Sequence, residues 1–257
     1  MPKMRIQKAL SQAGVASRRA VEQMIMDGRI TVNGQVVAKL PCFVDLAVDE
    51  VLVDGGRVGA RAPKCEYFLL NKPRGVVCTQ RDPQGRPRAY DLIPAGGKRL
   101  YCAGRLDADS TGLVILTNDG ALTEYLTHPR YGVVKTYVVE ADGRPEPDQL
   151  EQLTKGMYLD GKCTGGAQVA VLSRGADRSV LEIRLAEGRN REIRRLLARL
   201  GHKVRRLKRV AIGPITDKGL KIGSFRVLKQ FEIERLQRVG GRQRETSRRQ
   251  RERKHGR

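Results

Sequence analysis

One segment of the chain, residues 104–120, limits its structure more than any other. It begins with a turn-forming stretch that places the carboxylate of Asp107 two positions after the basic residue Arg105. An apolar run of β-forming residues follows at 113–116, and Asn-Asp-Gly at 118–120 closes the segment. A short apolar run bounded by turn residues predicts a buried strand. The segment therefore predicts a loop that carries a reactive acid and is held still by a strand in the core.

The charge balance indicates a polyanionic partner. The 257 residues include 50 Lys and Arg against 28 Asp and Glu, a formal net charge of +22. Such an excess favours nucleic acid as the partner, with an anionic membrane surface as the second candidate. No apolar run reaches the roughly 18 residues that a membrane span needs, and residues 1–6 lack the apolar core of a signal peptide. We therefore expect a cytoplasmic protein that does not bind a membrane.

The cysteines and histidines do not indicate a metal site. The five cysteines are widely spaced without a Cys-x-x-Cys pair, which predicts reduced, partly buried thiols. The three histidines lie far apart in the sequence. Aromatic residues make up only 4% of the chain and Trp is absent, so extensive base stacking is not expected.

The first 54 residues predict a small α/β module. Apolar spacing indicates a helix over 5–13, and Ser17 is a plausible N-cap for a second helix that ends at Gly28. Asn33-Gly34 is a strong hairpin signal between strands at 29–32 and 35–37, and residues 50–54 predict another strand.

Ser17-Arg18-Arg19 and residues 28–34 resemble the signature positions of the S4 RNA-binding domain. Arg18 and Arg19 would lie at a helix N-terminus, where backbone N–H groups already favour phosphate. Lys8 and Arg29 could lie on the same face. The resemblance implies that these four side chains bind RNA; the alternative is an ordinary solvated basic face.

The rest of the chain predicts a linker, a larger domain and a tail. Residues 55–64 are rich in Gly and basic residues and indicate a linker. A domain over 65–236 mixes strand and helix patterns, which predicts an α+β fold with a mixed, largely antiparallel sheet. Its expected strands lie at 66–70, 76–79, 136–140, 167–172 and 179–185, and its expected helices at 122–127, 147–155 and 192–200. The basic tail over 237–257 is expected to be disordered unless RNA binds it; a solvated tail is the alternative.

Three further motifs follow the segment at 104–120. Lys135-Thr136-Tyr137 begins a predicted strand. A Gly-led turn at 188–191 enters a helix with an apolar stripe. Residues 203–213 alternate apolar and basic side chains, which indicates a strand with a basic side facing phosphate or, alternatively, a solvated edge strand protected by charge.

In this order, the motifs resemble those of the RsuA/RluB family of bacterial rRNA pseudouridine synthases. The resemblance covers nearly the whole chain up to about residue 236, and residues 81–87 and Glu192 are most similar to the RluB-type branch, which acts on 23S rRNA. It implies that Asp107 is the catalytic carboxylate, which needs no cofactor. Taken alone, Asp107 would be read as a turn-capping residue. Asp109 is expected to be a loop-surface residue and Asp119 part of the turn.

The resemblance also implies roles for other side chains. Tyr137 would stack on the uracil and assist proton removal from C5, although a half-buried strand tyrosine is the simpler alternative. Arg194 would pair with Asp107 and keep it ionised. Arg105 would hold the RNA backbone or fill the gap left by a flipped base. The remaining expected contacts are to RNA, from Lys135, Asn190 and Arg191, and to the uracil, from Leu207.

Several alternatives stay open. The target could lie in 16S rather than 23S rRNA, and Asp107 could add to C1′ or remove the 2′-proton. A non-catalytic rRNA-binding assembly factor would keep the basic module without needing the three catalytic residues. A carboxylate-based nucleosidase or glycosidase would release free uracil. We expect a monomer whose partner is ribosomal RNA, within an assembly intermediate or free.

Overall fold

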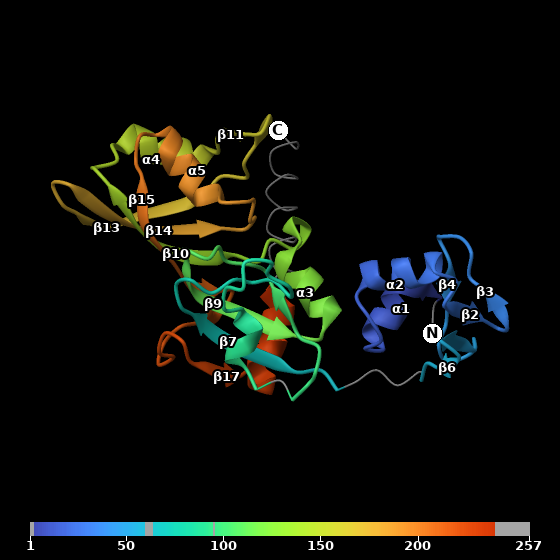
Figure 1. Ribbon diagram of the computed structural model, residues 1–257. Helices are drawn as coiled ribbons and strands as arrows, with labels where there is room; N and C mark the ends of the chain where they lie inside the picture. Colours follow the sequence, from blue (N-terminus) through green and yellow to red (C-terminus); the bar gives the residue numbers. More distant parts are fainter. Residues whose placement is uncertain (1–2, 60–63, 95, 240–257) are drawn as a thin grey trace. The chain divides into compact units, whose positions relative to one another are not determined.

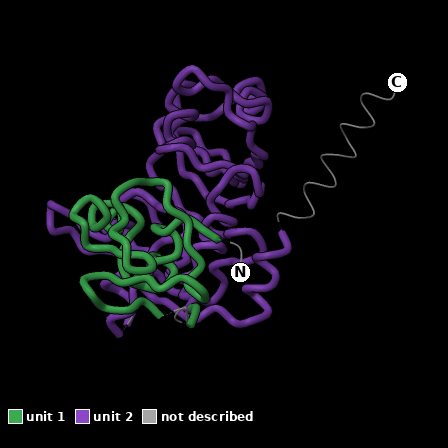
Figure 2. Tube along the Cα trace, turned by 90° about the vertical axis from the view of Figure 1, so that its right-hand side faces the viewer, with its two compact units in different colours: residues 1–65 green, residues 66–257 purple. Residues whose placement is uncertain are grey.

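The computed structural model describes residues 3–59, 64–94 and 96–239, and the chain divides after Cys65 into two compact units. Figure 2 colours the two units separately. Each is described by itself below.

Unit 1 packs two short helices against a small sheet. Ser17 caps the second helix, as expected, by accepting a hydrogen bond from the Ala20 N–H at 3.0 Å. Asn33 and Gly34 both have positive φ, as the predicted hairpin requires. The helices are α1 (Ile6–Gln12) and α2 (Arg18–Met26); the strands are β1 (Met4–Arg5), β2 (Ile30–Val32), β3 (Gln35–Val36), β4 (Phe43–Val44), β5 (Val51–Val53) and β6 (Gly56–Arg57). The sheet order is β3-β2-β5-β6, and β1 pairs with β4.

The segment expected as a linker at 55–64 begins instead with a strand. Asp54 and Gly55 have φ of 52° and 80° and turn the chain so that β6 pairs with β5. Two consecutive residues with positive φ suit a tight hairpin. The glycines of this stretch are typical of a linker, so this turn was not predicted. Residues 60–63 lie outside the described residues.

Unit 2 is built on a nine-stranded sheet of order β13-β14-β10-β15-β9-β7-β17, with β16 beside β15 and β8 beside β9 (Figure 1). Its neighbours are antiparallel except for β15 and β9, so the sheet is mixed and largely antiparallel, as predicted. The strands are β7 (Tyr67–Lys72), β8 (Tyr101–Ala103), β9 (Thr111–Thr117), β10 (Lys135–Asp142), β13 (Gln168–Arg174), β14 (Arg178–Leu185), β15 (Val204–Ile212), β16 (Ile215–Thr216) and β17 (Phe225–Val227).

Both faces of the central strands are buried, which explains the unbroken apolar run at 113–116. Val114 and Leu116 point into one core, which α4 (Pro147–Lys155) and α5 (Glu192–Arg199) help to close. Leu113 and Ile115 point into a second core on the other face, with α3 (Gly120–Thr127). Because β9 is fixed from both sides, it holds the loop that precedes it.

The remaining elements are short. A hairpin forms from β11 (Tyr158–Leu159) and β12 (Lys162–Cys163), and 3₁₀ turns cover Ala89–Leu92 and Pro129–Tyr131. The strand expected at 76–79 is reduced to one bridge, between Val77 and Arg88. Residues 230–239 are helical and bury Leu236 completely, so the expected tail does not begin at 237. The tail from 240 onward lies outside the described residues. Within the described chain, no helix is long and apolar enough to cross a membrane.

Candidate active site

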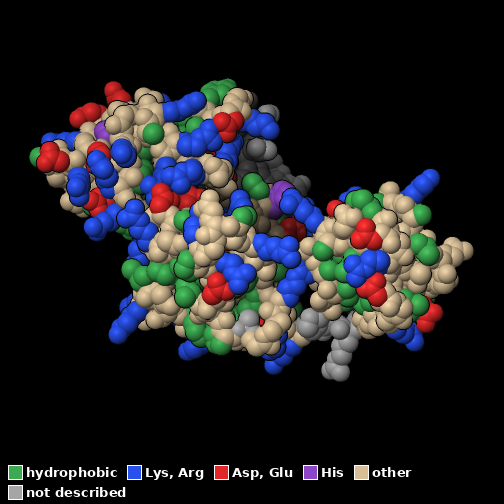
Figure 3. Space-filling view, viewed as in Figure 1, with side chains coloured by type: hydrophobic (Ala, Val, Ile, Leu, Met, Phe, Trp, Pro, Cys, Tyr) green, Lys and Arg blue, Asp and Glu red, His purple; other side chains and the backbone are tan. Residues whose placement is uncertain are grey.

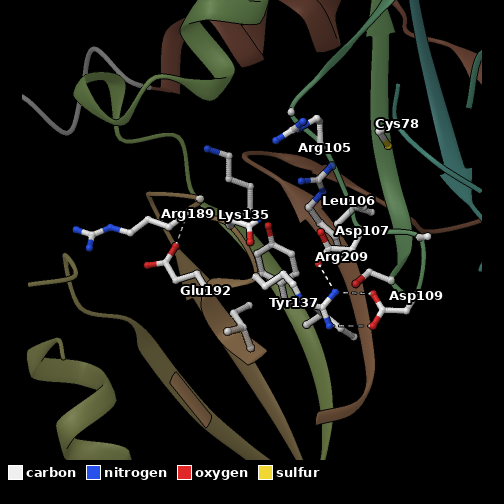
Figure 4. Close-up of a pocket in the computed structure, with 18 of the residues that line it drawn as sticks. Cys78, Arg105, Leu106, Asp107, Asp109, Lys135, Tyr137, Arg189, Glu192 and Arg209 are labelled. Atoms are coloured by element: carbon white, nitrogen blue, oxygen red, sulfur yellow. Dashed lines mark hydrogen bonds and ion pairs between the residues drawn. The ribbon is translucent and has the colours of Figure 1, made fainter. Parts of the chain in front are cut away.

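A pocket of about 600 Å³ opens in unit 2 between the loop before β9, the facing strands β10 and β15, and the turn before α5 (Figure 4). Asp107, Tyr137, Leu207 and Arg191 line it. These residues come from four separate stretches of sequence, and the sheet brings them together.

Backbone contacts hold the Asp107 loop. The Gly75 N–H donates to the Ala108 carbonyl at 2.7 Å, and the Ser110 N–H donates to the Asp107 carbonyl at 3.1 Å. Gly112, with φ of 107°, then crosses β15 so closely that a Cβ there would lie 2.2 Å from the Arg209 carbonyl oxygen. Only glycine fits this crossing, and it anchors the loop to the sheet.

The Asp107 carboxylate faces an arginine at the start of α5. Arg191 Nη1 lies 3.4 Å from Asp107 Oδ2, and the same guanidinium holds Asp109 at 3.2 Å and 3.3 Å. Arg191 has left-handed backbone angles, φ 48° and ψ 32°, immediately before the helix. This uncommon conformation for a non-glycine residue accompanies a side chain that reaches across the pocket.

Arg194 does not form the ion pair expected for it. Its Nη2 lies 3.1 Å from Asp109 Oδ2, and its Nη1 donates to the Val204 carbonyl at 3.1 Å. The side chain is only 11% exposed and lies behind the acids. Asp109, expected to be a loop-surface residue, is therefore the shared partner of Arg191 and Arg194. Residues three apart on a helix share a face, so spacing alone did not distinguish the two arginines.

The ion pairs shift the protonation of this cluster. Burial opposes ionisation of Asp109, but the hydrogen bond from Arg191 and the charge of Arg194 outweigh it and lower the pKa of Asp109. Burial lowers the pKa of the Arg194 guanidinium, and Asp109 and Asp107 act against that shift. Arg191 and Arg194 thus keep the Asp109 carboxylate, close to Asp107, ionised and ion-paired.

Tyr137, Lys135, Leu207 and Arg209 form the wall of the pocket that β10 and β15 supply. Tyr137 pairs with Arg209 across the sheet, and Val139 with Leu207. Because alternate residues of a strand share a face, Lys135 and Tyr137 both point into the pocket, as expected from their spacing. Burial, helped by the charge of Arg209, lowers the pKa of Lys135 to about 8.

Comparison with known proteins decides the family. Residues 66–199 match the family model for RNA pseudouridylate synthase, and residues 4–40 match the S4 domain. The chain belongs to the RNA pseudouridine synthase family. It is 39% identical over 234 residues to ribosomal large subunit pseudouridine synthase B of Bacillus subtilis, covering 90% of this chain and 95% of that protein.

Two further relatives support the family. An uncharacterized RNA pseudouridine synthase of Mycobacterium tuberculosis (strain H37Rv) is 43% identical over 241 residues, covering 93% of this chain and 94% of its own. A pseudouridylate synthase of known crystal structure is 31% identical with a TM-score of 0.66, covering 91% of this chain and 99% of that one. The S4 domain and the synthase domain of the predicted fold are both present.

The other expected RNA-binding residues of this pseudouridine synthase have different surroundings. Arg105 and Asn190 are exposed and line the pocket. In unit 1, Arg18 and Arg19 are exposed and Lys8 is half-buried. Arg29 makes a bidentate ion pair with Asp54, at 2.8 Å and 2.6 Å. Its charge is therefore partly neutralised within the protein.

Three ionisable groups near the site were not expected from the sequence. Lys72, taken as part of a basic turn, is fully buried and donates to the Pro73 and Val76 carbonyls. Arg209, one of several basic residues on β15, is only 3% exposed. Burial raises the pKa of Glu192, which lines the pocket, to about 7. Lys72 continues the strand predicted at 66–70, and Arg209 lies two positions from Leu207 and from Ala211, so it shares a strand face with apolar residues. These two positions were the available signals.

Basic side chains are also spread over the surface. Figure 3 shows Lys and Arg on both units, with Asp and Glu among them. Many surface arginines are ion-paired, including Arg195 with Asp160 and Arg205 with Asp142. The basic surface suits a polyanion, whereas the buried and ion-paired acids and bases of the candidate site lie in the pocket.

Proposed function

We propose that this protein converts a uridine of large-subunit (23S) ribosomal RNA to pseudouridine, with Asp107 as the catalytic carboxylate. The observation that carries the proposal is the placement of Asp107, fixed by the backbone and ion-paired with Arg191, in a pocket of a chain that belongs to this family. The large-subunit target is supported by the name of the Bacillus subtilis relative.

The reaction is an isomerisation. The N1–C1′ bond of the uridine breaks, the uracil turns, a C5–C1′ bond forms, and the C5 proton is lost while N1 gains one. An ionised Asp107 either adds to C1′ or removes the 2′-proton. Both routes need a carboxylate held in position, and Arg191 holds it.

The other residues fit supporting roles. Tyr137 presents its ring to the uracil and lies where it can assist proton removal from C5. Leu207 gives the base an apolar contact. Arg194 acts as a positioning residue through Asp109. Arg105 would support a nucleotide flipped out of its stack.

Unit 1 would hold ribosomal RNA by its shape and phosphates. Arg18 and Arg19 lie in the first turn of α2, where the backbone N–H groups favour phosphate. Lys8 would add a further contact. We propose that the protein does this as a monomer in the cytoplasm.

The experiment that tests the proposal is Asp107→Asn. Purified full-length wild type should form pseudouridine in 23S rRNA transcripts, while the variant should lose at least about 1,000-fold in rate because the carboxylate acts directly on the substrate. Pseudouridine mapping of 23S and 16S transcripts provides the measurement. Rate and rRNA affinity are compared with those of Asp148→Asn, which makes the same charge change on exposed α4.

Four outcomes would contradict the proposal. Modification by Asp107→Asn at the wild-type rate would remove Asp107 from the chemistry. Pseudouridine in 16S alone would overturn the large-subunit target. Release of free uracil would identify a nucleosidase, and rRNA binding without any product from wild type would identify an assembly factor.

A further inference from the structure

Lys135 and Arg209 form a cationic patch inside the pocket, on the adjacent strands β10 and β15 (Figure 4). Arg209 is 3% exposed, and its Nε donates to the Leu113 carbonyl at 2.6 Å. Its Nη2 is buried, and in the described part of the chain it has no hydrogen-bond partner. Buried polar groups are nearly always hydrogen-bonded, so this nitrogen is available to a bound molecule.

The acids of the pocket are engaged elsewhere. Asp107 and Asp109 pair with Arg191, and Glu187 pairs with Arg189. The pKa of Lys135 is lowered by burial and by Arg209, and none of the described carboxylates acts against that shift. Two like charges therefore share a partly desolvated wall, an arrangement that favours an anion from outside the protein.

The Cys78 thiol supplies only part of a counter-charge. A hydrogen bond from Cys102, the Leu106 N–H and the charges of Lys72 and Arg209 lower the pKa of Cys78 to about 6. Lys72 also points at the Pro73 and Val76 carbonyls, away from a ligand. Cys78 is thus one acidic group beside two cations, Lys72 and Arg209, and it does not act on Lys135.

We infer that Lys135 and Arg209 bind a phosphodiester group next to the target nucleotide. This inference rests on the proposed function, because it takes RNA as the substrate. Uridine itself is neutral, and the anionic groups of an RNA chain are its phosphodiesters. A guanidinium with an Nη group that lacks a partner in the protein suits a phosphate oxygen. With the base near Tyr137 and the sugar near Asp107, Lys135 and Arg209 would remain in the same pocket for a phosphodiester next to that nucleotide.

The arrangement gives the pocket two functions. Asp107 presents its carboxylate to the sugar. Lys135 and Arg209 would bind the phosphodiester backbone that carries that sugar. Fixing the phosphate restricts the sugar relative to Asp107, so the patch would act on orientation.

Dinucleotides with and without a charged linkage test this inference. ApU and UpA place the phosphodiester 5′ or 3′ of uridine, and each is compared with its neutral methylphosphonate analogue by titration calorimetry on the full chain. Wild type should bind at least one charged dinucleotide about tenfold more tightly than its analogue. Lys135→Met and Arg209→Gln should each reduce that preference to about twofold or less.

Controls separate this effect from folding and from the general charge. Lys155→Met removes a positive charge on exposed α4, where Lys155 pairs with Glu151, and it should keep the full preference. Lys135 is less buried than Arg209, so Lys135→Met serves if Arg209→Gln does not fold. Equal binding of both linkages by wild type, or an undiminished preference in a folded variant, would overturn the inference.

The result is independent of turnover. A chain that prefers the charged linkage but forms no pseudouridine keeps the inference and loses the proposed function. Pseudouridine formation without a linkage preference refutes the inference alone. If the variants convert uridine more slowly but keep the linkage preference, the inference is overturned, and Lys135 and Arg209 act on the uracil and not on the phosphodiester.

Discussion

The two walls of the pocket carry opposite electrostatic arrangements. On one wall, Asp107 and Asp109 are compensated by Arg191 and Arg194, and every charge has a partner. On the other wall, Lys135 and Arg209 carry like charges, and none of the described carboxylates offsets the effect of Arg209 on Lys135. Charges that are paired hold their side chains in position, whereas unpaired charges of one sign favour binding of an oppositely charged ligand. The difference separates positioning from binding within one cavity.

The largest expected effect comes from Gly112→Ala, which disturbs both walls at once. Its Cβ would lie 2.2 Å from the Arg209 carbonyl oxygen, and the residue has φ of 107°. We expect a loss of about 4 kcal/mol or more in the free energy of unfolding, measured by denaturant titration. Gly188→Ala, where nothing lies within 4 Å, should lose less than about 1 kcal/mol. A Gly112→Ala loss as small as the control's would show that the crossing is not tight.

The two arginines of the compensated wall should separate activity from stability. Arg191 is 44% exposed and touches Asp107, so Arg191→Met should slow pseudouridine formation roughly 10- to 100-fold with a stability loss below about 1 kcal/mol. Arg194 is 11% exposed, so Arg194→Met should cost about 1–3 kcal/mol by leaving Asp109 and the Val204 carbonyl short of a donor.

Single-turnover rates and denaturant titrations of both variants provide the comparison. The prediction would be contradicted if Arg194→Met folded normally but were inactive while Arg191→Met stayed fully active. That result would show that Arg194, and not Arg191, is the functional partner of Asp107. Arg191→Lys keeps the positive charge but lacks the planar guanidinium that can contact two acids at once, so it should recover only part of the rate.

The smallest expected effect concerns pH and the uncompensated wall. Lys135 has a pKa of about 8 in the folded chain, below its ordinary value of 10.5. Between these two values the unfolded chain binds more protons, so this lysine makes stability rise with pH across that window. We expect a gain on the order of 1 kcal/mol between pH 8 and 10 in wild type relative to Lys135→Met. Denaturant titrations at both pH values measure it, and parallel pH curves would contradict it.

The sequence predicted most elements because their signals are local. α4 begins and ends at the expected residues, and the Ser17 cap and the Asn33-Gly34 turn form as read. The β6 hairpin was missed because Asp54-Gly55 lies in a glycine-rich stretch that resembles a linker. The helix over 230–239 was not predicted, and the tail was placed from 237 onward because that stretch is rich in Gly, Arg and Gln, although Leu236 just before it is fully buried.

The sequence by itself determined the family, the presence of an S4 domain and a synthase domain, and several of the residues that line the pocket, because motif order and hydrophobic periodicity are written along the chain. Only the tertiary structure decided which charged side chains form ion pairs with one another. The left-handed turn at Arg191 puts that arginine on Asp107, and the β9–β15 crossing at Gly112 packs Arg209 beside the Asp107 loop. Ion pairs and burial depend on distances across the sheet, and spacing along the sequence does not encode those distances.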